Sequence, residues 1–188
     1  MPRPLALALV PLLLLAAALT GCTQPTRLPP PEPSASGEPL FASDEEALAA
    51  AFSAYERYLQ VSNTLSASVD ADTGLLEEVA IPGHVEEVAA SIEALRSQGL
   101  RTEGQAEIYT FNLQQHFEGS NGDVSVLTYV CLDVSGLRVV DGQGRDNTPP
   151  DRADFVGLEV VFWGINGPFP DLKVASSKTW SGSDLCVG

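Results

Sequence analysis

Acid–base chemistry on a small molecule is the reaction for which this sequence holds the most candidate groups. Such chemistry needs a carboxylate base and a phenol within hydrogen-bond reach of one carbon atom. The candidate pocket residues are Tyr55, Tyr58, Tyr109, Tyr129 and Asp133, and His116 is a further candidate group. No spacing in the sequence unites them. Tyrosines on amphipathic elements equally suit an apolar core that satisfies their hydroxyl groups at its edge, so both interpretations stay open.

Metal chemistry has weaker support. The two histidines, His84 and His116, are far apart and have no carboxylate at the spacing of a metal ligand. Residues 141–147 faintly resemble a calcium loop, but no glutamate closes it and Arg145 stands where an acidic or amide ligand is needed. The sequence also lacks Gly-x-Ser-x-Gly, Gly-Lys-Ser/Thr and His-Glu-x-x-His motifs. We therefore expect neither a metal nor a cofactor.

The chain is strongly acidic, with 10 basic and 25 acidic residues among 188 and a formal net charge of −15 at pH 7. Binding to nucleic acid needs a basic patch that releases counterions, and the few lysines and arginines are not clustered. Anionic lipid headgroups would be repelled for the same reason. We therefore expect no nucleic acid partner, and a membrane contact only through a covalently attached lipid.

The N-terminus resembles that of a bacterial lipoprotein. Leu19-Thr20-Gly21-Cys22 is similar to a lipobox, and the apolar run from Leu5 to Leu19 behind Arg3 has the length of a signal-peptide core rather than of a membrane span. In such lipoproteins the cysteine thiol receives a diacylglyceryl group before cleavage. The resemblance implies that residues 1–21 are a signal peptide and that Cys22 anchors the protein to the extracytoplasmic face of the cell membrane.

Assigning Cys22 to lipidation leaves Cys131 and Cys186 as a pair. A disulfide is permitted in an extracytoplasmic compartment, and the loop that it would close corresponds to about 4 kcal/mol of stabilisation in the chain-entropy model. Two separately buried thiols are the alternative.

Behind the anchor, residues 22–43 form a tether and residues 44–188 a folded domain. The tether is rich in proline and could extend the domain by roughly 60 Å. Ser43 to Glu46 is a capping-box arrangement, which with the apolar spacing that follows predicts a helix from Asp44 to Ser62. Leu75, Leu76 and Val79 indicate a short second helix that ends at Pro82-Gly83, and a third helix follows from Val85 and stops at Gly99.

From here the apolar period changes from helical to alternating. We expect a long strand over residues 103–117, a hairpin turn at 118–123 and a strand over 124–134 that holds Cys131. A polar excursion occupies residues 135–152. Two more strands, at residues 153–163 and 172–180, flank a turn at 166–168. Helices followed by a four-stranded antiparallel meander predict an α+β fold.

This order of elements resembles the nuclear transport factor 2-like fold, also called a cystatin-like cone, in which N-terminal helices pack on a curved antiparallel sheet. Four stretches are similar to those of actinobacterial lipoproteins of this type, namely Phe52–Tyr58, Asp70–Leu76, Tyr129–Ser135 and Trp180–Cys186. The fold includes isomerases, dehydratases, polyketide cyclases and many non-enzymatic binding or dimerising modules, so the fold alone does not choose a function.

The combined evidence favours a surface-anchored lipoprotein of the cell envelope with a non-catalytic domain that binds a ligand or another protein. Its expected partners are a small apolar ligand, an envelope protein or a second copy that contacts it through the sheet. The alternative is a small pocket enzyme that performs acid–base chemistry on an apolar molecule, as an isomerase, dehydratase or cyclase does. The interior of the cone distinguishes them, because an open pocket with convergent polar groups favours the enzyme.

The lipid anchor can be tested with Cys22→Ala. Because the thiol accepts the acyl group, we expect this variant to accumulate as an unprocessed precursor or to be released from the membrane. Detergent-phase partitioning measures the outcome. A variant that partitions into detergent like the unmodified chain would show that Cys22 is not the anchor.

Overall fold

The computed structural model describes residues 40–119, 122–165, 171–182 and 185–186. The expected signal peptide, Cys22, most of the tether and the turn expected at residues 166–168 lie outside the described residues. No helix within these ranges is long and apolar enough to cross a membrane.

The first helix, α1 (Asp44–Ala67), begins at the predicted capping box. The Ser43 hydroxyl accepts a hydrogen bond from the Glu46 N–H at 3.3 Å, and the Glu46 carboxylate accepts one from the Ala42 N–H at 2.7 Å. The helix continues beyond the predicted end at Ser62. The added turn carries Leu65, which is fully buried, so tertiary packing extends the helix.

The next two helices correct the expected boundaries. A 3₁₀ helix, η1 (Thr73–Glu78), begins where the Asp72 carboxylate accepts a hydrogen bond from the Gly74 N–H. Pro82 opens α2 (Pro82–Ser97) instead of ending the previous helix. Proline suits the first position of a helix, because the N–H that it lacks would have no partner inside the helix. Gly99, with a φ of 70°, follows the end of α2 as predicted.

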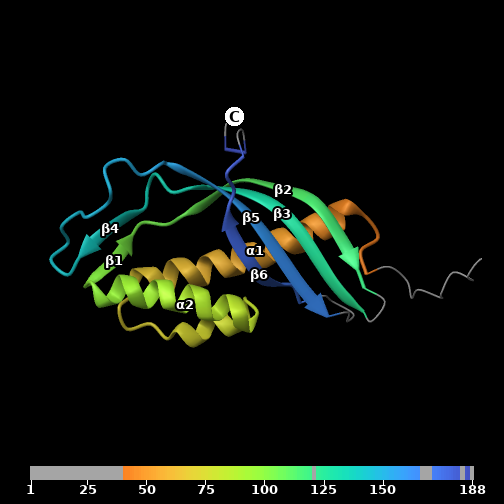
Figure 1. The fold of residues 1–188 in the computed structure, drawn as a ribbon, viewed down its shortest axis with the longest axis horizontal. Coiled ribbons are helices and arrows are strands. Elements are labelled where there is room, and N and C mark those ends of the chain that lie inside the picture. The colour runs from red at the N-terminus through yellow and green to blue at the C-terminus, as the bar shows by residue number, and fades with distance from the viewer. Residues whose placement is uncertain (1–39, 120–121, 166–170, 183–184, 187–188) are drawn as a thin grey trace, which may run out of the picture. The chain divides into compact units, whose positions relative to one another are not determined.

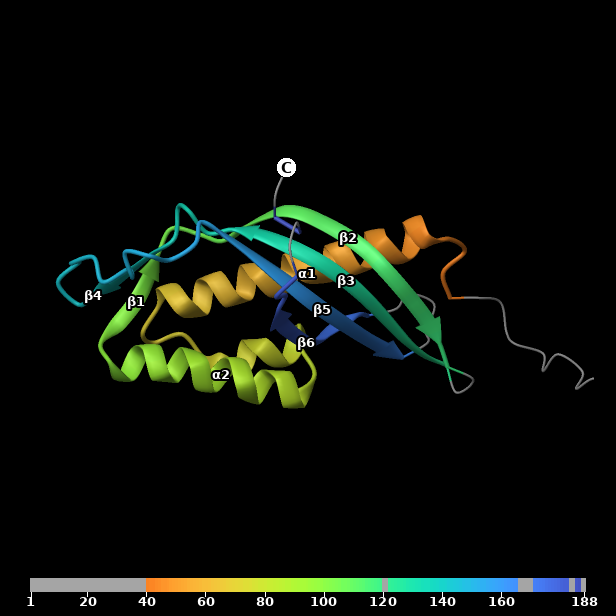
Figure 2. The same cartoon turned by 45° about the horizontal axis from the view of Figure 1, so that its top comes forward.

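The main sheet contains four antiparallel strands in the order β2 (Glu107–Glu118), β3 (Asp123–Asp133), β5 (Phe155–Ile165) and β6 (Lys173–Thr179). Figure 1 and Figure 2 show that this sheet is curved and that the helices lie on its concave side. The predicted α+β architecture, with N-terminal helices packed on a curved four-stranded antiparallel sheet, is therefore confirmed.

A second, two-stranded sheet was not predicted. It pairs β1 (Leu100–Glu103) with β4 (Arg138–Asp141), which lies inside the expected polar excursion. The single strand predicted over residues 103–117 is in fact split into β1 and β2 at Gly104. This glycine has a φ of 85°, and a Cβ atom there would collide with the carbonyl oxygen of Gly136, so the strand has to break here.

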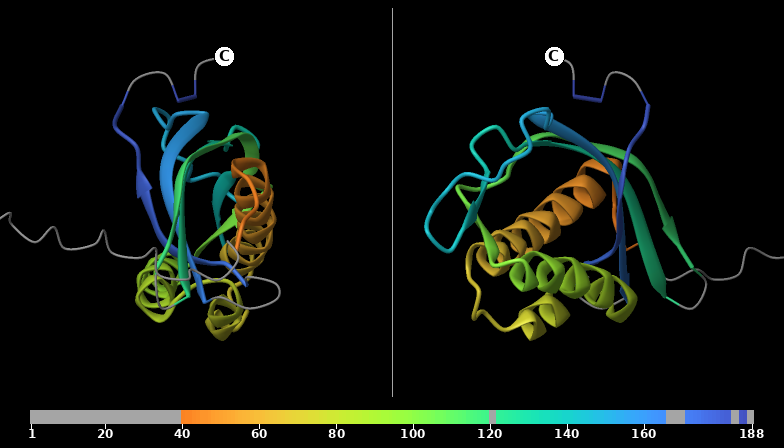
Figure 3. Two further views of the ribbon diagram at one scale, coloured as in Figure 1. Left: turned by 90° about the vertical axis from the view of Figure 1, so that its right-hand side faces the viewer. Right: turned by 60° about the vertical axis from the view of Figure 1, so that its left-hand side comes forward.

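The core fills the space between α1 and the concave face of the sheet (Figure 3). Alternate residues of β3, from Val124 to Val130, point into this space and are buried. Tyr55 of α1 packs among them, with ring centroids 5.8 Å from Phe111 and 6.2 Å from Phe162. Burying an apolar side chain of this size contributes about 1.5–3 kcal/mol. In the described part of the chain, side chains therefore occupy the interior of the cone.

The C-terminal segment is fixed to the opposite, convex face. Cys131 and Cys186 form a disulfide across a sequence separation of 55, with their Cα atoms 5.4 Å apart, so the predicted pairing is confirmed. The Trp180 N–H donates to the Gly157 carbonyl oxygen at 2.8 Å. A side chain at Gly157 would lie only 3.2 Å from the Leu185 side chain, so glycine here lets the segment lie flat on β5.

Reduction tests the contribution of this disulfide. A stabilisation of about 4 kcal/mol corresponds to a fall in melting temperature of roughly 10 °C in a domain of this size. We expect no free thiol in the folded, non-reduced chain that starts at residue 22 and carries Cys22→Ser. Calorimetry should show the same fall after reduction and in Cys186→Ser, with no further fall when Cys186→Ser is reduced. Equal melting temperatures before and after reduction would contradict this role.

Candidate functional site

The five residues considered for acid–base chemistry divide between the two faces of the sheet. Tyr55 and Tyr58 project from α1 into the core, where they are 1% and 7% exposed. On β3, Tyr129 and Asp133 alternate with the buried Thr128 and Val130, so they lie on the convex face.

Each convex-face residue has a local partner. The Tyr129 ring packs on Trp180 at 4.4 Å, and the Tyr109 ring packs on Phe155 at 4.9 Å. Hydrogen bonds from Ser135, through its side chain and its backbone N–H, hold the pKa of Asp133 below its ordinary value. The structure therefore does not bring the five residues together around one substrate.

A polar chain, buried at Tyr58 and His84 and exposed at Glu87, joins α1 to the start of α2. The Tyr58 hydroxyl lies 3.0 Å from His84 Nε2, and His84 Nδ1 lies 3.3 Å from a Glu87 carboxylate oxygen. A carboxylate only accepts, so Nδ1 donates to Glu87 and Nε2 accepts from the phenol. Burial, together with the nearby Glu87 charge, raises the pKa of Tyr58, although a hydrogen bond with Ser62 opposes this.

This chain borders a hollow of about 420 Å³ between α1 and α2. Three serines, Ser66, Ser91 and Ser177, contribute to its lining. The sequence pattern placed His84 just before a helix that was expected to start at Val85. The signal that was available is the i, i+3 spacing of His84 and Glu87, which places both on one face once a helix is known to begin at Pro82.

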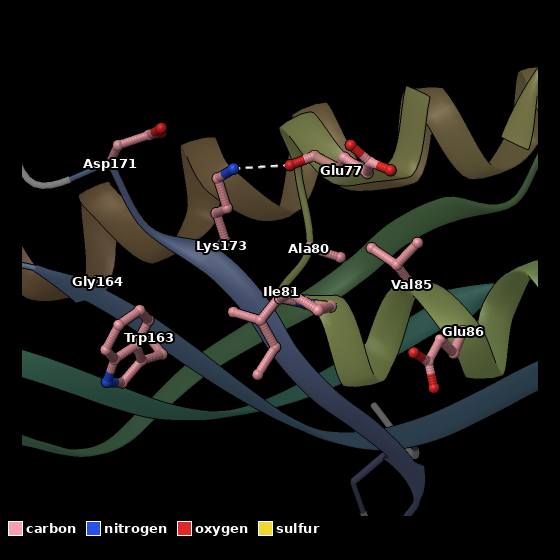
Figure 4. A pocket seen from close by; sticks show the side chains of 10 residues that line it. Glu77, Ala80, Ile81, Val85, Glu86, Trp163, Gly164, Asp171 and Lys173 are labelled. Carbon is pink, nitrogen blue, oxygen red and sulfur yellow. Dashed lines mark hydrogen bonds between the residues drawn. The ribbon is translucent and has the colours of Figure 1, made fainter. Parts of the chain in front are cut away.

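A larger pocket, of about 720 Å³, lies where the connection between η1 and α2 meets the ends of β5 and β6. The connection is held there by backbone pairing with β6: the Val174 N–H donates to the Val79 carbonyl at 2.9 Å, and the Ile81 N–H donates to the Val174 carbonyl at 3.0 Å. Figure 4 shows Ile81 between Trp163 and Val85. The described lining consists of Glu77, Ala80, Ile81, Pro82, Val85, Glu86, Trp163, Gly164, Asp171 and Lys173.

The lining of this pocket combines apolar side chains with four charged residues, and two of the charged groups already have partners. Lys173 Nζ donates to the Glu77 carbonyl oxygen at 2.7 Å, and the Asp171 carboxylate pairs with Arg57 at 3.3 Å. Trp163 is 38% exposed and offers a ring face. We name this site the Trp163 pocket. Its chemistry suits contact with an apolar or aromatic molecule more than proton transfer.

Sequence reasoning did not identify the Trp163 pocket. Trp163 follows the buried Phe162 on β5, so strand alternation places it on the other face, and an outward tryptophan was the signal available. The contribution of Ile81 and Pro82 depends on their pairing with β6, which is a long-range contact that no local pattern encodes.

Within the described residues, no group of three His, Cys, Asp or Glu side chains is arranged to hold a metal ion. The loop with a faint resemblance to a calcium site is a turn at the end of β4. The Asp141 carboxylate accepts hydrogen bonds from the backbone N–H groups of Gln143 and Arg145 and pairs with Arg145 Nε at 2.6 Å. The arginine that disfavoured calcium in the sequence is thus the partner of this carboxylate.

Comparison with known proteins gives a likeness in fold. No family model and no curated protein matches the chain. The intermembrane space region of chloroplast protein ARC6 superposes with a TM-score of 0.53 at 9% identity, over 72% of this chain and 97% of that one. This likeness supports the arrangement of helices and sheet and says nothing about activity.

Two bacterial structures superpose less well. Aln2 from a Streptomyces species has a TM-score of 0.41 at 15% identity, over 73% of this chain and 90% of that one. A conserved protein from Planctomyces limnophilus has a TM-score of 0.34 at 14% identity, over 69% and 91%. Neither value supports a functional argument.

Alkaline titration tests the burial of the two core tyrosines. Burial raises the pKa of Tyr55 and of Tyr58 above the ordinary value of 10.0. A group whose pKa is raised by folding stabilises the folded state at pH values below its ordinary pKa. This stabilisation is lost as the pH rises towards the folded-state pKa. We therefore expect the free energy of unfolding to fall above about pH 10.

Tyrosinate absorbance gives a direct measurement. Two of the 4 tyrosines should ionise only as the protein unfolds. Tyr55→Phe and Tyr58→Phe should each remove one late-ionising group. Ionisation of all tyrosines while the circular dichroism of the fold is unchanged would contradict the assignment.

Proposed function

We propose that this chain is a cell-envelope lipoprotein, anchored through Cys22 on the extracytoplasmic face of the membrane, whose domain binds a small apolar ligand in the Trp163 pocket without transforming it. The anchor rests on the lipobox resemblance at residues 19–22. The binding role rests on the shape and chemistry of the pocket.

The observation that carries the binding role is the apolar wall formed by Ile81, Val85 and Trp163 around a space of about 720 Å³. This volume falls within the range of roughly 300–1,000 Å³ that is typical of small-molecule sites. Asp171 and Lys173 are engaged with protein groups, as described above. The pocket therefore favours contact with apolar surface, while Glu77 and Glu86, which also line it, are available to orient a polar end of the ligand.

The packing inside the cone supports a non-catalytic role. In this fold type an enzyme would place its acid and base in the cone interior, but Tyr55, Phe111 and Phe162 pack together there. The convex face offers a surface for an envelope protein or a second copy, since Phe117 and Phe155 are exposed on it.

The alternative function, acid–base catalysis on a small molecule, is favoured by one observation, the chain formed by Tyr58, His84 and Glu87 beside the smaller hollow. An imidazole Nε2 atom can serve as a general base, and the Glu87 carboxylate on Nδ1 would orient the ring. Against this role, His84 is only 4% exposed and its Nε2 atom already accepts from the phenol.

Ligand binding can be tested with a neutral fluorescent probe, N-phenyl-1-naphthylamine, and the soluble chain from residue 22 with Cys22→Ser. All described helices, strands and the disulfide lie beyond residue 40, so this chain retains them. We expect saturable binding that Trp163→Ala weakens about tenfold, because the ring contact and its buried area are lost. Phe117→Ala removes an exposed aromatic ring outside the pocket and should leave binding unchanged.

Two results would contradict this proposal. Equal affinity of Trp163→Ala and the unmodified chain would exclude the pocket as the binding site. Conversion of a bound small molecule that is lost in His84→Gln, with the fold intact, would favour the catalytic alternative.

A further inference from the structure

The outer edge of the main sheet has no paired strand among the described residues. β2 is the first strand in the order β2-β3-β5-β6, so only one of its two edges pairs with a strand in the described part of the chain. Between Ile108 and Phe117 it contains no lysine, arginine, aspartate, glutamate, proline or glycine. Proteins normally use such residues to block pairing at an exposed edge.

The pairing register limits where another strand could add. Register shifts in β2 lie between Ile108 and Thr110 and between Leu113 and Gln115, and such irregularities bend a strand locally. From Thr110 to Leu113 the register with β3 runs without interruption. This stretch therefore presents regular backbone N–H and C=O groups along the outer edge.

A groove of about 490 Å³ runs beside this edge, between β2 and the first half of α1. Figure 3 shows α1 and β2 next to each other. Phe52 of α1 is 37% exposed and contacts Phe111 edge to face at 5.3 Å, and Leu48 lies one turn earlier on the helix. Alternate side chains of an added strand would contact these apolar groups, as in peptide recognition by strand addition.

The charge around the groove selects the kind of partner. Its described lining contains one charged residue, Glu45, and no lysine or arginine. Glu107 and Glu118 lie at the two ends of β2. A second copy of the chain would bring another net charge of −15 and the same carboxylates to this edge, so self-association is disfavoured and basic residues are favoured.

We propose that the groove between α1 and β2 binds an extended, basic segment of a partner protein, which adds a strand to the free edge of β2 at Thr110–Leu113. The backbone of β2 supplies hydrogen bonds, Leu48 and Phe52 contact alternate apolar side chains, and Glu45 attracts the flanking basic residues. This site shares no lining residue with the Trp163 pocket, so either can fail without the other.

The probe for this site is a fluorescein-labelled synthetic peptide with three valines alternating with two threonines and two lysines at each end. Fluorescence anisotropy with the soluble chain from residue 22, carrying Cys22→Ser, should show saturable binding. Phe52→Asp and Glu45→Lys should each weaken it about tenfold. Glu93→Lys, an exposed position on α2, makes the same change in net charge and should alter the affinity less than twofold.

Two further measurements separate strand addition from general charge attraction. The same peptide with N-methyl groups on its central backbone nitrogens should bind at least tenfold more weakly. Amide hydrogen exchange should slow at Thr110–Leu113 when the unmodified peptide is bound.

Three results would overturn the proposal. The first is that the N-methylated peptide binds as tightly as the unmodified peptide. The second is that Glu45→Lys and Glu93→Lys weaken peptide binding equally. The third is that the amides of Thr110–Leu113 are protected in a dimer of the chain without peptide. Circular dichroism of each variant confirms that the fold is intact before its affinity is compared.

Discussion

The contact between α1 and the concave face of the sheet holds the helical and sheet layers of this domain together. Tyr55 lies between Phe111 of β2 and Phe162 of β5, so one helical side chain links two strands that are not neighbours in the sheet. Burying these rings stabilises the curvature of the sheet around the helix. It also fills the space between the helix and the sheet with aromatic side chains.

Because side chains fill the interior, the hollows available to a partner lie at the borders of the core. The Trp163 pocket forms where the chain between η1 and α2 joins β6, and the groove beside Phe52 forms where α1 passes along the edge of β2. In both places an aromatic side chain remains more than a third exposed. Each site is therefore an exposed apolar surface, at a junction between elements, on a highly acidic protein.

The C-terminal segment adds a constraint on the convex face. Through the disulfide and the contact of Trp180 with Tyr129, it covers Cys131 and Gly157 in the middle of the sheet. This arrangement holds the last described residues in place. Cys131 of the central strand β3 therefore fixes the C-terminal segment to the convex face.

Local patterns in the chain were enough to predict the class of fold and much of the order of elements. The capping box at Ser43, the apolar spacing of α1 and the alternation of β3 each reflect a period or a cap that the backbone imposes. The pairing of Cys131 with Cys186 followed from the number of cysteines and the expected compartment. The lipid anchor at Cys22 and the tether remain predictions from the sequence.

Tertiary packing, by contrast, decides which of the candidate reactive residues lie close together. Tyr129 and Asp133 of β3 lie on the opposite face from Tyr55 and Tyr58, and Tyr109 of β2 packs there on Phe155. Strand alternation separates the two faces, but the sequence does not show which face is buried. The contact of Tyr58 with His84 joins two helices, and Ile81 reaches Trp163 only through pairing with β6. Contacts of this kind form between distant segments, so local sequence patterns do not encode them.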